Sequence, residues 1–281
     1  MALLIDGVAL VTGGGSGIGK EVSLAYAHEG ARAVVIADLN HASATATAAA
    51  CDVVATNPLF KSLPLAVDVS DPASVTAMVD AAVAAFGRID YSVNSAGVGV
   101  RRPLSVEDAD LAEMNRFWAV NVMGTLHCIQ AVSKVMKAQS VATVPTGRGR
   151  DAKGTREVGR GVILNLGSAN SFIATPHIVQ YSTTKHALMG MTKNAALDLA
   201  AHGIRVNAIC PSWVDTPMVE EAINGNPELP KMMKSIIPME RIARPEEIAD
   251  VVMFMTSPRS SYVTGVGWLV DGGTTIQVQT C

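Results

Sequence analysis

The sequence is poor in two residue groups that mark particular classes of protein. Only 4% of its 281 residues are aromatic and only 17% are charged, with 22 Lys and Arg against 25 Asp and Glu. A protein that binds the phosphate backbone of a nucleic acid needs a strongly basic face, so we expect no nucleic-acid partner. The hydrophobic share of 49% is nevertheless enough for a large buried core.

Cysteine is scarce and widely spaced. The thiols are Cys51, Cys128, Cys210 and Cys281, and no CxxC pair for zinc or redox chemistry exists among them. The six histidines include no HExxH motif, so we expect no metal site. Free thiols in a reducing compartment are the expected state.

Long hydrophobic runs and a basic leader are also missing. No apolar run approaches the roughly 18 residues of a membrane span. The first basic residue is Lys20, which does not fit a secretory signal peptide. We therefore expect a soluble, cytoplasmic protein with no membrane partner.

What the sequence does contain is a regular alternation of short β-branched runs with longer Ala-rich stretches of helical period. Strands are expected at 8–11, 33–37, 63–67, 89–93, 162–166, 204–209 and 268–270, and helices at, among others, 74–86, 110–138 and 181–202. Apolar runs without in/out alternation are typical of strands buried on both faces. The pattern predicts a Rossmann-type, doubly wound α/β fold with a mostly parallel seven-stranded sheet and helices on both faces.

The alternation continues without a linker, so we expect one domain over residues 1–281. Two segments interrupt it. Residues 139–160 are rich in Gly, Thr and basic side chains and are interpreted as a surface insertion. Residues 212–240 hold several Pro and Met with little clear period, and they follow a strand end, where ligands bind in this architecture. They are interpreted as a substrate loop.

A glycine-rich turn, Thr12-Gly13-Gly14-Gly15-Ser16-Gly17-Ile18-Gly19, joins the first strand to the first helix. Such a turn lets the backbone approach a pyrophosphate, which the helix N-terminus then binds. Asp38 follows at the end of the second strand, where a carboxylate accepts from the ribose hydroxyls of NAD. An acid at this position repels a 2′-phosphate, and neither Ser16 nor Leu39 is basic. The sequence therefore favours NAD(H) over NADP(H).

Tyr181 and Lys185 lie four residues apart at the start of a helical pattern, hence on one face. A free phenol titrates near about 10, and a nearby ammonium lowers the pKa of a phenol toward the range useful for acid–base catalysis. Ser168 directly follows the fifth strand. Strand ends and helix starts are where an open α/β sheet gathers its site.

In this order the motifs resemble the short-chain dehydrogenase/reductase family over nearly the whole chain. The matching segments are Thr12–Gly19, Asp68-Val69, Asn94–Gly97, Asn121–Gly124, Ser168, Tyr181–Lys185 and Pro211–Thr216. Two positions depart from the family pattern. Ser95 replaces a usual Asn, and Ser212 replaces a usual Gly. The excess length between Asn121 and Ser168 corresponds to the 139–160 insertion.

The resemblance implies four catalytic residues. Tyr181 would be the general acid/base at the substrate oxygen, and Ser168 would orient that oxygen. Lys185 would bind the nicotinamide ribose and act on Tyr181. Asn121 would kink its helix and hold a water in a proton relay to Lys185.

It also implies a cofactor site. Asp68 and Val69 would contact the adenine, and Asn94, Ala96 and Gly97 would flank the adenosine and ribose. Val214 and Thr216 would fix the carboxamide. The glycine-rich turn, Asp38 and the pair of Tyr181 and Lys185 complete the expected cofactor site. The remaining cofactor-binding residues are therefore Gly13, Ser16, Gly17, Ile18, Gly19, Asp38, Tyr181 and Lys185.

The variable substrate pocket of the family is lined by residues after the active Ser and by the loop after the sixth strand. The corresponding residues are Asn170, Phe172, Ile173, His177, Ile178, Trp213, Met218, Ile223, Met232 and Met233. Of these, Asn170, Phe172, Ile178, Trp213 and Met218 are the predicted pocket. The set is mostly apolar, with adaptable Met side chains, which indicates a neutral, bulky, cyclic substrate.

The resulting hypothesis is an NAD-dependent oxidoreductase that moves a hydride between nicotinamide and a secondary alcohol or ketone. Two alternatives stay open: a non-catalytic dinucleotide sensor, and a biosynthetic enzyme that uses the fold for cyclisation or isomerisation. Family members are commonly tetramers built through the two long helices, so a homo-oligomer, tetramer or dimer, is expected.

Overall fold

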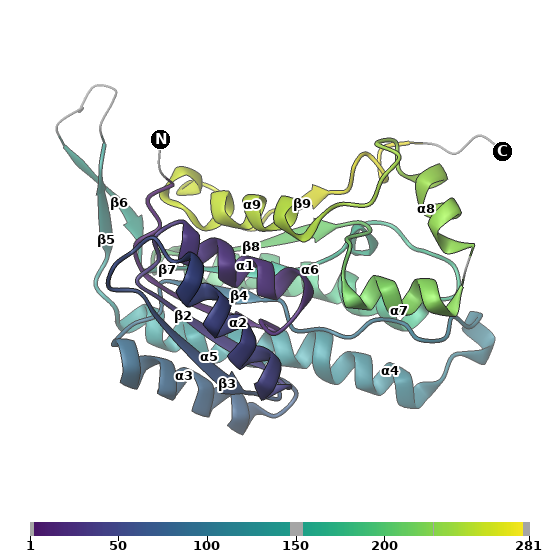
Figure 1. Ribbon diagram of the computed structural model, residues 1–281, viewed down its shortest axis with the longest axis horizontal. Coiled ribbons are helices and arrows are strands. Elements are labelled where there is room, and N and C mark those ends of the chain that lie inside the picture. Colours follow the sequence, from purple (N-terminus) through teal and green to yellow (C-terminus); the bar gives the residue numbers. More distant parts are fainter. Residues whose placement is uncertain (1–2, 147–153, 227, 278–281) are drawn as a thin grey trace.

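A seven-stranded sheet forms the centre of the computed structural model, which describes residues 3–146, 154–226 and 228–277 (Figure 1). The strand order is β3-β2-β1-β4-β7-β8-β9, and all neighbouring strands are parallel. The strands are β1 (Val8–Thr12), β2 (Ala33–Asp38), β3 (Lys61–Ala66), β4 (Tyr91–Asn94), β7 (Gly161–Leu166), β8 (Ile204–Pro211) and β9 (Gly267–Val270). The predicted sheet is confirmed, with strand ends shifted by one or two residues.

Both faces of this sheet are buried, which is why its strands carry uninterrupted apolar runs. In β1, Ala9 and Val11 belong to one hydrophobic cluster and Leu10 to the other. The edge strand β3 is more exposed and holds Pro64. A proline is tolerated there because an edge strand has one side free of ladder hydrogen bonds.

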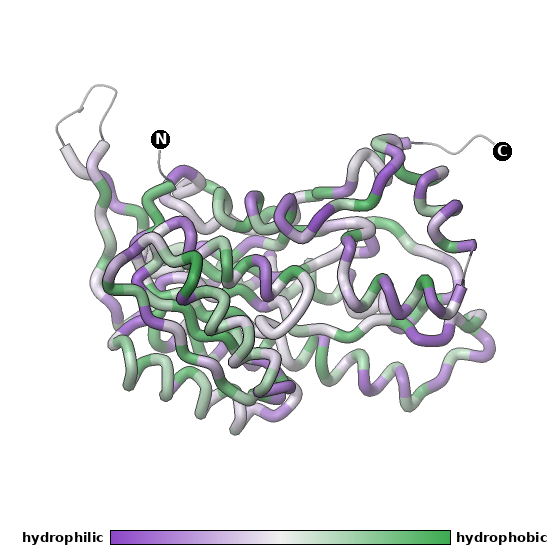
Figure 2. Tube along the Cα trace, in the orientation of Figure 1, coloured by the Kyte–Doolittle hydropathy of each residue, from purple (hydrophilic) through white to green (hydrophobic). Residues whose placement is uncertain are grey.

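Two layers of helices cover the faces (Figure 1). The first layer consists of α1 (Gly17–His28), α2 (His41–Val54) and α9 (Pro245–Thr256). The second contains α3 (Pro72–Phe86), α4 (Leu111–Phe117), the π-helical segment η2 (Trp118–Gly124), α5 (Thr125–Ala138) and α6 (Val179–Ala200). Figure 2 shows that hydrophobic residues gather in the strands and the helices against them. The predicted layers are confirmed.

The helix expected over 110–138 is one rod made of α4, η2 and α5. Its middle is π-helical, and Asn121 lies in that segment. π-Helical turns insert an extra residue into a helix and occur frequently at functional sites. The distortion therefore marks the position where the resemblance implied a kink.

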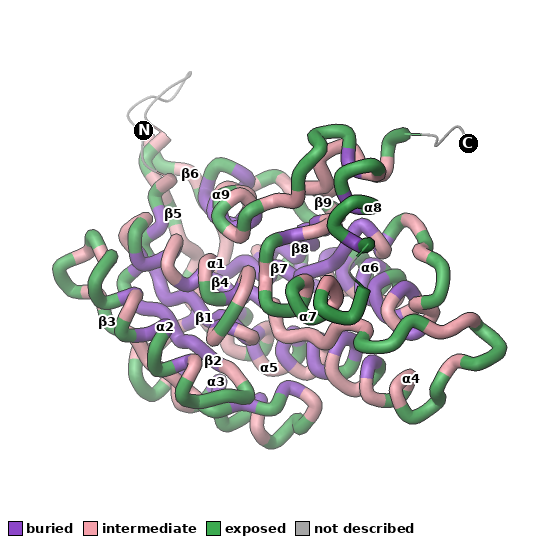
Figure 3. The backbone as a smooth tube through the Cα atoms, turned by 45° about the vertical axis from the view of Figure 1, so that its right-hand side comes forward, coloured by how far each residue is buried: buried purple, intermediate pink, exposed green. Residues whose placement is uncertain are grey.

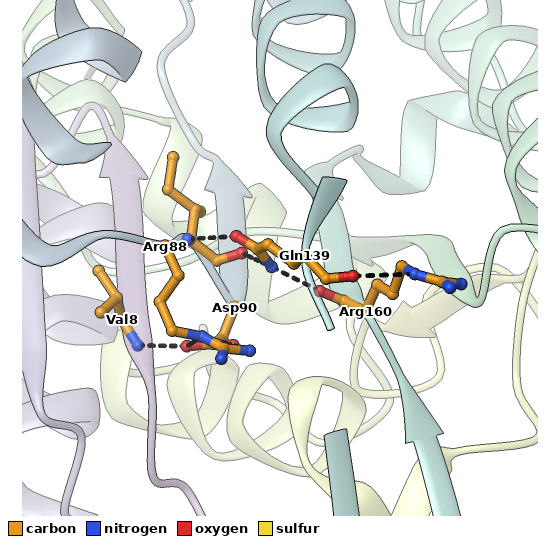
Figure 4. Close-up of polar contacts among 6 residues, drawn as sticks. Val8, Arg88, Asp90, Gln139 and Arg160 are labelled. Carbon is orange, nitrogen blue, oxygen red and sulfur yellow. Dashed lines mark hydrogen bonds and ion pairs between the residues drawn. The ribbon is translucent and has the colours of Figure 1, made fainter. Parts of the chain in front are cut away.

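The expected surface insertion is an antiparallel hairpin of β5 (Ala142–Pro145) and β6 (Thr155–Gly159), which projects from the body (Figure 1). Its basic residues Arg148, Arg150 and Lys153 lie outside the described residues. Hydrogen bonds of Gln139 and Arg160 close its base (Figure 4).

The segment 212–240, expected to be a loop, instead contains two helices, α7 (Pro217–Gly225) and α8 (Leu229–Ile236). Each has fewer than ten residues, too few to show a clear apolar period. Most of their residues are exposed (Figure 3), and the buried Leu229, Met233 and Ile237 form a separate small core. A bridge between Val214 and Ala243 joins the two ends of the segment.

Within the described part of the chain, none of the helices is long and apolar enough to cross a membrane. The same residues contain no group of three or more His, Cys, Asp or Glu that could hold a metal ion.

Candidate active site

A cavity of about 330 Å³ opens at the carboxyl ends of β1, β2, β3 and β4. The strand order reverses direction between β1 and β4, and open α/β sheets bind ligands at such a switch point. Most of the predicted cofactor-binding residues line this cavity: Gly13, Ser16, Gly17, Ile18, Asp38, Asp68, Val69, Ala96, Gly97 and Thr216.

The glycine-rich turn forms one wall of the cavity. Its glycines are needed because a side chain at Gly13 or Gly19 would collide with neighbouring backbone. A Cβ at Gly13, where φ is +67°, would lie 2.8 Å from the backbone of Ala96. Gly19 does not line the cavity, but a Cβ there would lie 2.2 Å from the carbonyl oxygen of Gly13, so it allows α1 to pack on the turn. Within the described structure, Ser16 caps α1 without a side-chain hydrogen bond. The first N–H groups of α1 are therefore available to an anion.

Asp38 ends β2 at the rim of this cavity. Its Oδ2 accepts a hydrogen bond of 2.9 Å from the backbone N–H of Gly15, and its Oδ1 accepts one of 2.9 Å from Asn40. The carboxylate is thus fixed to the glycine-rich turn. Of the described residues that line the cavity, none is Lys or Arg, so the rim offers negative charge and no cation.

Asp68 and Val69 form the opposite wall. Asp68 Oδ1 accepts from the N–H and the hydroxyl of Ser70. Val69 packs closely on Gly124, where a Cβ would lie 2.7 Å from the Val69 side chain. His127 Nδ1 lies 3.0 Å from the carbonyl oxygen of Val69. The end of η2 and the first turn of α5 therefore support the turn that the resemblance assigns to the adenine.

Besides Gly19, four predicted cofactor residues do not line this cavity: Tyr181 and Lys185, described below, and Asn94 and Val214. Asn94 is buried and its Nδ2 donates to Asn165 Oδ1 at 2.8 Å, while Asn165 in turn donates to Thr192 at 2.9 Å. This chain of amides joins β4, β7 and α6 inside the fold. Val214 is also buried, at the bridge to Ala243. Both residues fix the backbone around the cavity.

Tyr181 and Lys185 share one face of α6, as predicted. Lys185 is 8% exposed, and its Nζ donates to the carbonyl oxygen of Leu166 at 2.7 Å. The same Nζ lies 5.6 Å from the centroid of the Tyr181 ring. Phe117 packs edge-on against that ring at 6.3 Å between centroids. The ammonium is thus anchored at the end of β7, beside the phenol.

Ser168 follows β7 and caps the short 3-10 helix η3 (Ala169–Ser171). Its Oγ accepts from the N–H of Asn170 at 3.2 Å, and its own N–H donates to Ser171 Oγ at 3.2 Å. The residue is 6% exposed. The Oγ lone pair that faces Asn170 is thereby occupied, which restricts the orientation of the hydroxyl.

Asn121 is buried, and its side-chain amide forms two hydrogen bonds with the backbone of Val98. Its Oδ1 accepts from Val98 N–H at 2.9 Å, and its Nδ2 donates to the Val98 carbonyl at 3.3 Å. The Nδ2 also donates to Thr184 Oγ1, next to Lys185, at 3.4 Å. Asn121 thus connects the loop after β4 with α6. Together, the four predicted catalytic residues place an amide, a hydroxyl, a phenol and an ammonium on adjoining elements.

The predicted substrate pocket is only partly assembled around these groups. Asn170 and Ile178 lie between Ser168 and Tyr181 in the sequence. Asn170 belongs to η3, and Ile178 directly precedes α6 and forms a β-bridge with Leu104. Phe172 is 45% exposed and packs over Gly267 of β9. Trp213 packs instead against the small core below α8.

Met218 belongs to the cofactor cavity, where it also contacts Gly99. The position was expected to line the substrate pocket. Val98 and Val120 line the same cavity and were not predicted. Their signal in the sequence is only adjacency, because each stands next to a predicted residue, Gly97 or Asn121.

Comparison with known proteins agrees with this geometry. A family model described as "short chain dehydrogenase" matches residues 7–146, and one described as "Enoyl-(Acyl carrier protein) reductase" matches residues 150–275. The short-chain dehydrogenase anuF of Penicillium roqueforti is 68% identical over 281 residues, covering 100% of both chains.

Solved structures show the same fold. The crystal structure of a levodione reductase has a TM-score of 0.86 and 32% identity, covering 98% of this chain and 99% of that one. The 3-ketoacyl-(acyl-carrier-protein) reductase from Brucella melitensis complexed with NADH has a TM-score of 0.77 and 31% identity, covering 95% and 98%. The chain is therefore an oxidoreductase of the short-chain dehydrogenase/reductase family, whose fold binds a nicotinamide dinucleotide.

Proposed function

We propose that the protein is an NAD-dependent oxidoreductase that interconverts a secondary alcohol and a ketone on a neutral, bulky, cyclic substrate. The observation that carries the cofactor part is Asp38, held by Gly15 N–H at the rim of a cavity whose described lining contains no Lys or Arg. A 2′-phosphate would meet a carboxylate there without a compensating cation, whereas ribose hydroxyls can donate to the carboxylate.

The residues present fit a dinucleotide. The glycine-rich turn leaves no room for side chains, and the first N–H groups of α1 can bind a pyrophosphate. Asp68 and Val69 would hold the adenine, and Thr216 lies beside Gly17 in the cavity lining. When bound, the nicotinamide supplies the hydride chemistry. Among solved relatives, the NADH complex of the Brucella melitensis reductase agrees with this choice.

The chain's own groups would handle the proton. We assign Tyr181 as the acid/base at the substrate oxygen and Ser168 as the hydroxyl that orients this oxygen. Lys185, anchored on the Leu166 carbonyl oxygen beside the phenol ring, would bind the nicotinamide ribose. Asn121 would fix the loop after β4 and connect Lys185 to solvent through water.

The substrate class rests on apolar side chains in the segments that follow Ser168 and β8. Phe172 is an exposed ring after η3, and Met218 lines the cofactor cavity, where it contacts Gly99. These groups offer apolar contact and no charge to clamp a carboxylate or phosphate. A neutral cyclic substrate fits this surface, with Ile178 beside the reacting oxygen.

The test is a set of turnover measurements that follow the nicotinamide absorbance with NAD and with NADP. The panel contains cyclohexanol, decalol and a hydroxysteroid, their ketones, levodione and a linear hydroxy acid. We expect turnover of cyclic members with NAD and much less with NADP. Preference for NADP would contradict the role of Asp38, and turnover of the hydroxy acid alone would contradict the substrate class.

We further propose one domain over the whole chain and a homo-oligomer, dimer or tetramer. The rod of α4, η2 and α5 exposes large apolar side chains, with Leu111 77% and Trp118 41% exposed. On α6, Leu197 is 78% exposed. Light scattering coupled to size-exclusion chromatography measures the oligomer directly, and a monomer at micromolar concentration would contradict it.

A further inference from the structure

Asn170 connects the two elements that carry the catalytic hydroxyl and the catalytic phenol. Its backbone N–H donates to Ser168 Oγ at 3.2 Å. Its side-chain Oδ1 accepts from Ser182 Oγ at 3.3 Å and from Thr175 Oγ1 at 3.0 Å. Ser182 directly follows Tyr181 on α6. One residue is therefore bonded both to the Ser168 hydroxyl and to the first turn of the helix that presents Tyr181.

The chain between these two elements is long enough to need such a connection. Residues 172–178 join η3 to α6 without a helix or strand of their own. Within this loop, Phe172 is 45% exposed and His177 has a φ of +67°. An irregular, partly exposed segment of this kind does not by itself hold two side chains at a fixed separation. The Asn170 amide spans the gap directly.

The two serines that Asn170 bonds are both buried. Ser182 is 8% exposed and Ser168 is 6% exposed. Buried hydroxyls are satisfied by hydrogen bonds in folded proteins. With two hydroxyls donating to Oδ1, the amide of Asn170 is fixed in orientation, and the 3-10 helix η3 is held against α6.

We propose that Asn170 is a positioning residue that sets the place of Ser168 relative to Tyr181. The inference rests on the proposed function, in which both groups act on one substrate oxygen. It also revises the sequence-based assignment of Asn170 to the substrate pocket, because positioning needs no contact with substrate. A displacement of about 1 Å in an active site can lower the rate by about a hundredfold.

Four variants distinguish positioning of Ser168 from direct contact with the substrate. Asn170→Leu removes the acceptor while keeping a similar shape, and Asn170→Asp keeps an acceptor oxygen. Ser182→Ala removes the donor on α6. Thr175→Val removes the donor in the loop and is the matched control, because it leaves the bond to α6 intact.

We expect kcat to fall about tenfold to a hundredfold in Asn170→Leu and in Ser182→Ala. The KM for NADH should stay unchanged, Asn170→Asp should recover most of kcat, and Thr175→Val should resemble the wild type. The assay is reduction of the cyclic ketone that the wild type turns over fastest. An increase in its KM with kcat unchanged in Asn170→Leu would show substrate contact and overturn the proposal.

Two further readouts separate misplacement from loss of folded protein. With NADH deuterated at the transferred position, the kinetic isotope effect on kcat should increase in Asn170→Leu because the chemical step becomes slower. Fewer folded molecules would leave the isotope effect unchanged, which would contradict positioning.

The second readout needs no turnover. Crystal structures of the wild type and Asn170→Leu should differ in the separation of Ser168 Oγ from the Tyr181 hydroxyl, and an unchanged separation would overturn the proposal. If the wild type reduces no ketone of the panel, the proposed substrate class fails, but these two structures still decide the role of Asn170.

Discussion

Gln139 and Arg160 each bind the other's backbone at the base of the projecting hairpin. Gln139 Nε2 donates to the Arg160 carbonyl at 2.8 Å, and Arg160 Nε donates to the Gln139 carbonyl at 3.0 Å (Figure 4). Gln139 also bonds the N–H and the carbonyl of Ile89, just before β4, and Arg160 reaches the carbonyl of His202, just before β8. The base is thus fixed to the amino end of the sheet, whereas the candidate site lies at the carboxyl ends.

The hairpin should therefore be dispensable for catalysis. Ala142 pairs with Gly159, so replacing residues 143–158 by Asn-Gly should give a tight two-residue hairpin. We expect unchanged kcat and unchanged KM for NAD. Gln139→Ala is the comparison variant, because it keeps the hairpin but removes the side chain that fixes its base. It should lower the free energy of unfolding by about 1–3 kcal/mol, since the backbone groups of Ile89 and Arg160 lose their partners. Loss of cofactor binding in the shortened chain would show that the hairpin serves the site.

Replacing Asp38 tests cofactor choice. In Asp38→Ala the carboxylate that faces the ribose hydroxyls is lost, and with it a charge-assisted hydrogen bond. We expect NAD to bind about tenfold or more weakly and NADP to bind better than in the wild type. The measurement is the dissociation constant of each cofactor by calorimetry. Asp52→Ala is the control and should leave both constants as they are, because Asp52 lies near the end of α2, where it accepts from Ser62 at the start of β3, away from the cavity. An unaltered NAD to NADP ratio in Asp38→Ala would exclude the assigned role.

Glu247 predicts a specific response to acid. Hydrogen bonds from Arg241, joined by the backbone N–H of Arg244, lower the pKa of this carboxyl from 4.5 to about 2. A lowered pKa stabilises the fold above the unfolded value of 4.5, and this stabilisation is lost as the pH falls toward 2. The wild type should therefore exceed Glu247→Gln in stability near neutral pH, by less than about 1 kcal/mol because the pair is exposed.

That difference should shrink steadily as the pH is lowered. Urea unfolding of both proteins across this pH range measures it. Glu246→Gln removes a carboxylate from the same turn of α9 but leaves the pair with Arg241, so it serves as the control. A constant difference at all pH values would contradict the role of the ion pair.

The repetitive parts of the molecule were predictable from sequence. Buried strands need continuous apolar runs when both faces are covered, and the glycine-rich turn, Asp38 and the Tyr181 and Lys185 pair carry local spacing that defines their positions. The π-helical segment around Asn121 was anticipated only as a kink implied by the resemblance.

Other features depend on contacts between distant segments. The small core below α8 draws Trp213 away from the pocket, and no local pattern reveals this. Asn94 turns toward Asn165 because the two strands pair. The Asn170 contact likewise joins residues across a loop. Side-chain direction in such places is decided by tertiary packing, which sequence periodicity does not contain.

The measurement that tests the central claim most directly is the turnover of Tyr181→Phe beside its affinity for NADH. The substitution removes the phenolic hydroxyl and leaves the ring that packs on Phe117. We expect kcat to fall by about a hundredfold to ten-thousandfold, the usual share of acid–base catalysis, with the dissociation constant of NADH unchanged. Turnover close to that of the wild type would contradict the assignment of Tyr181 as the proton donor and acceptor.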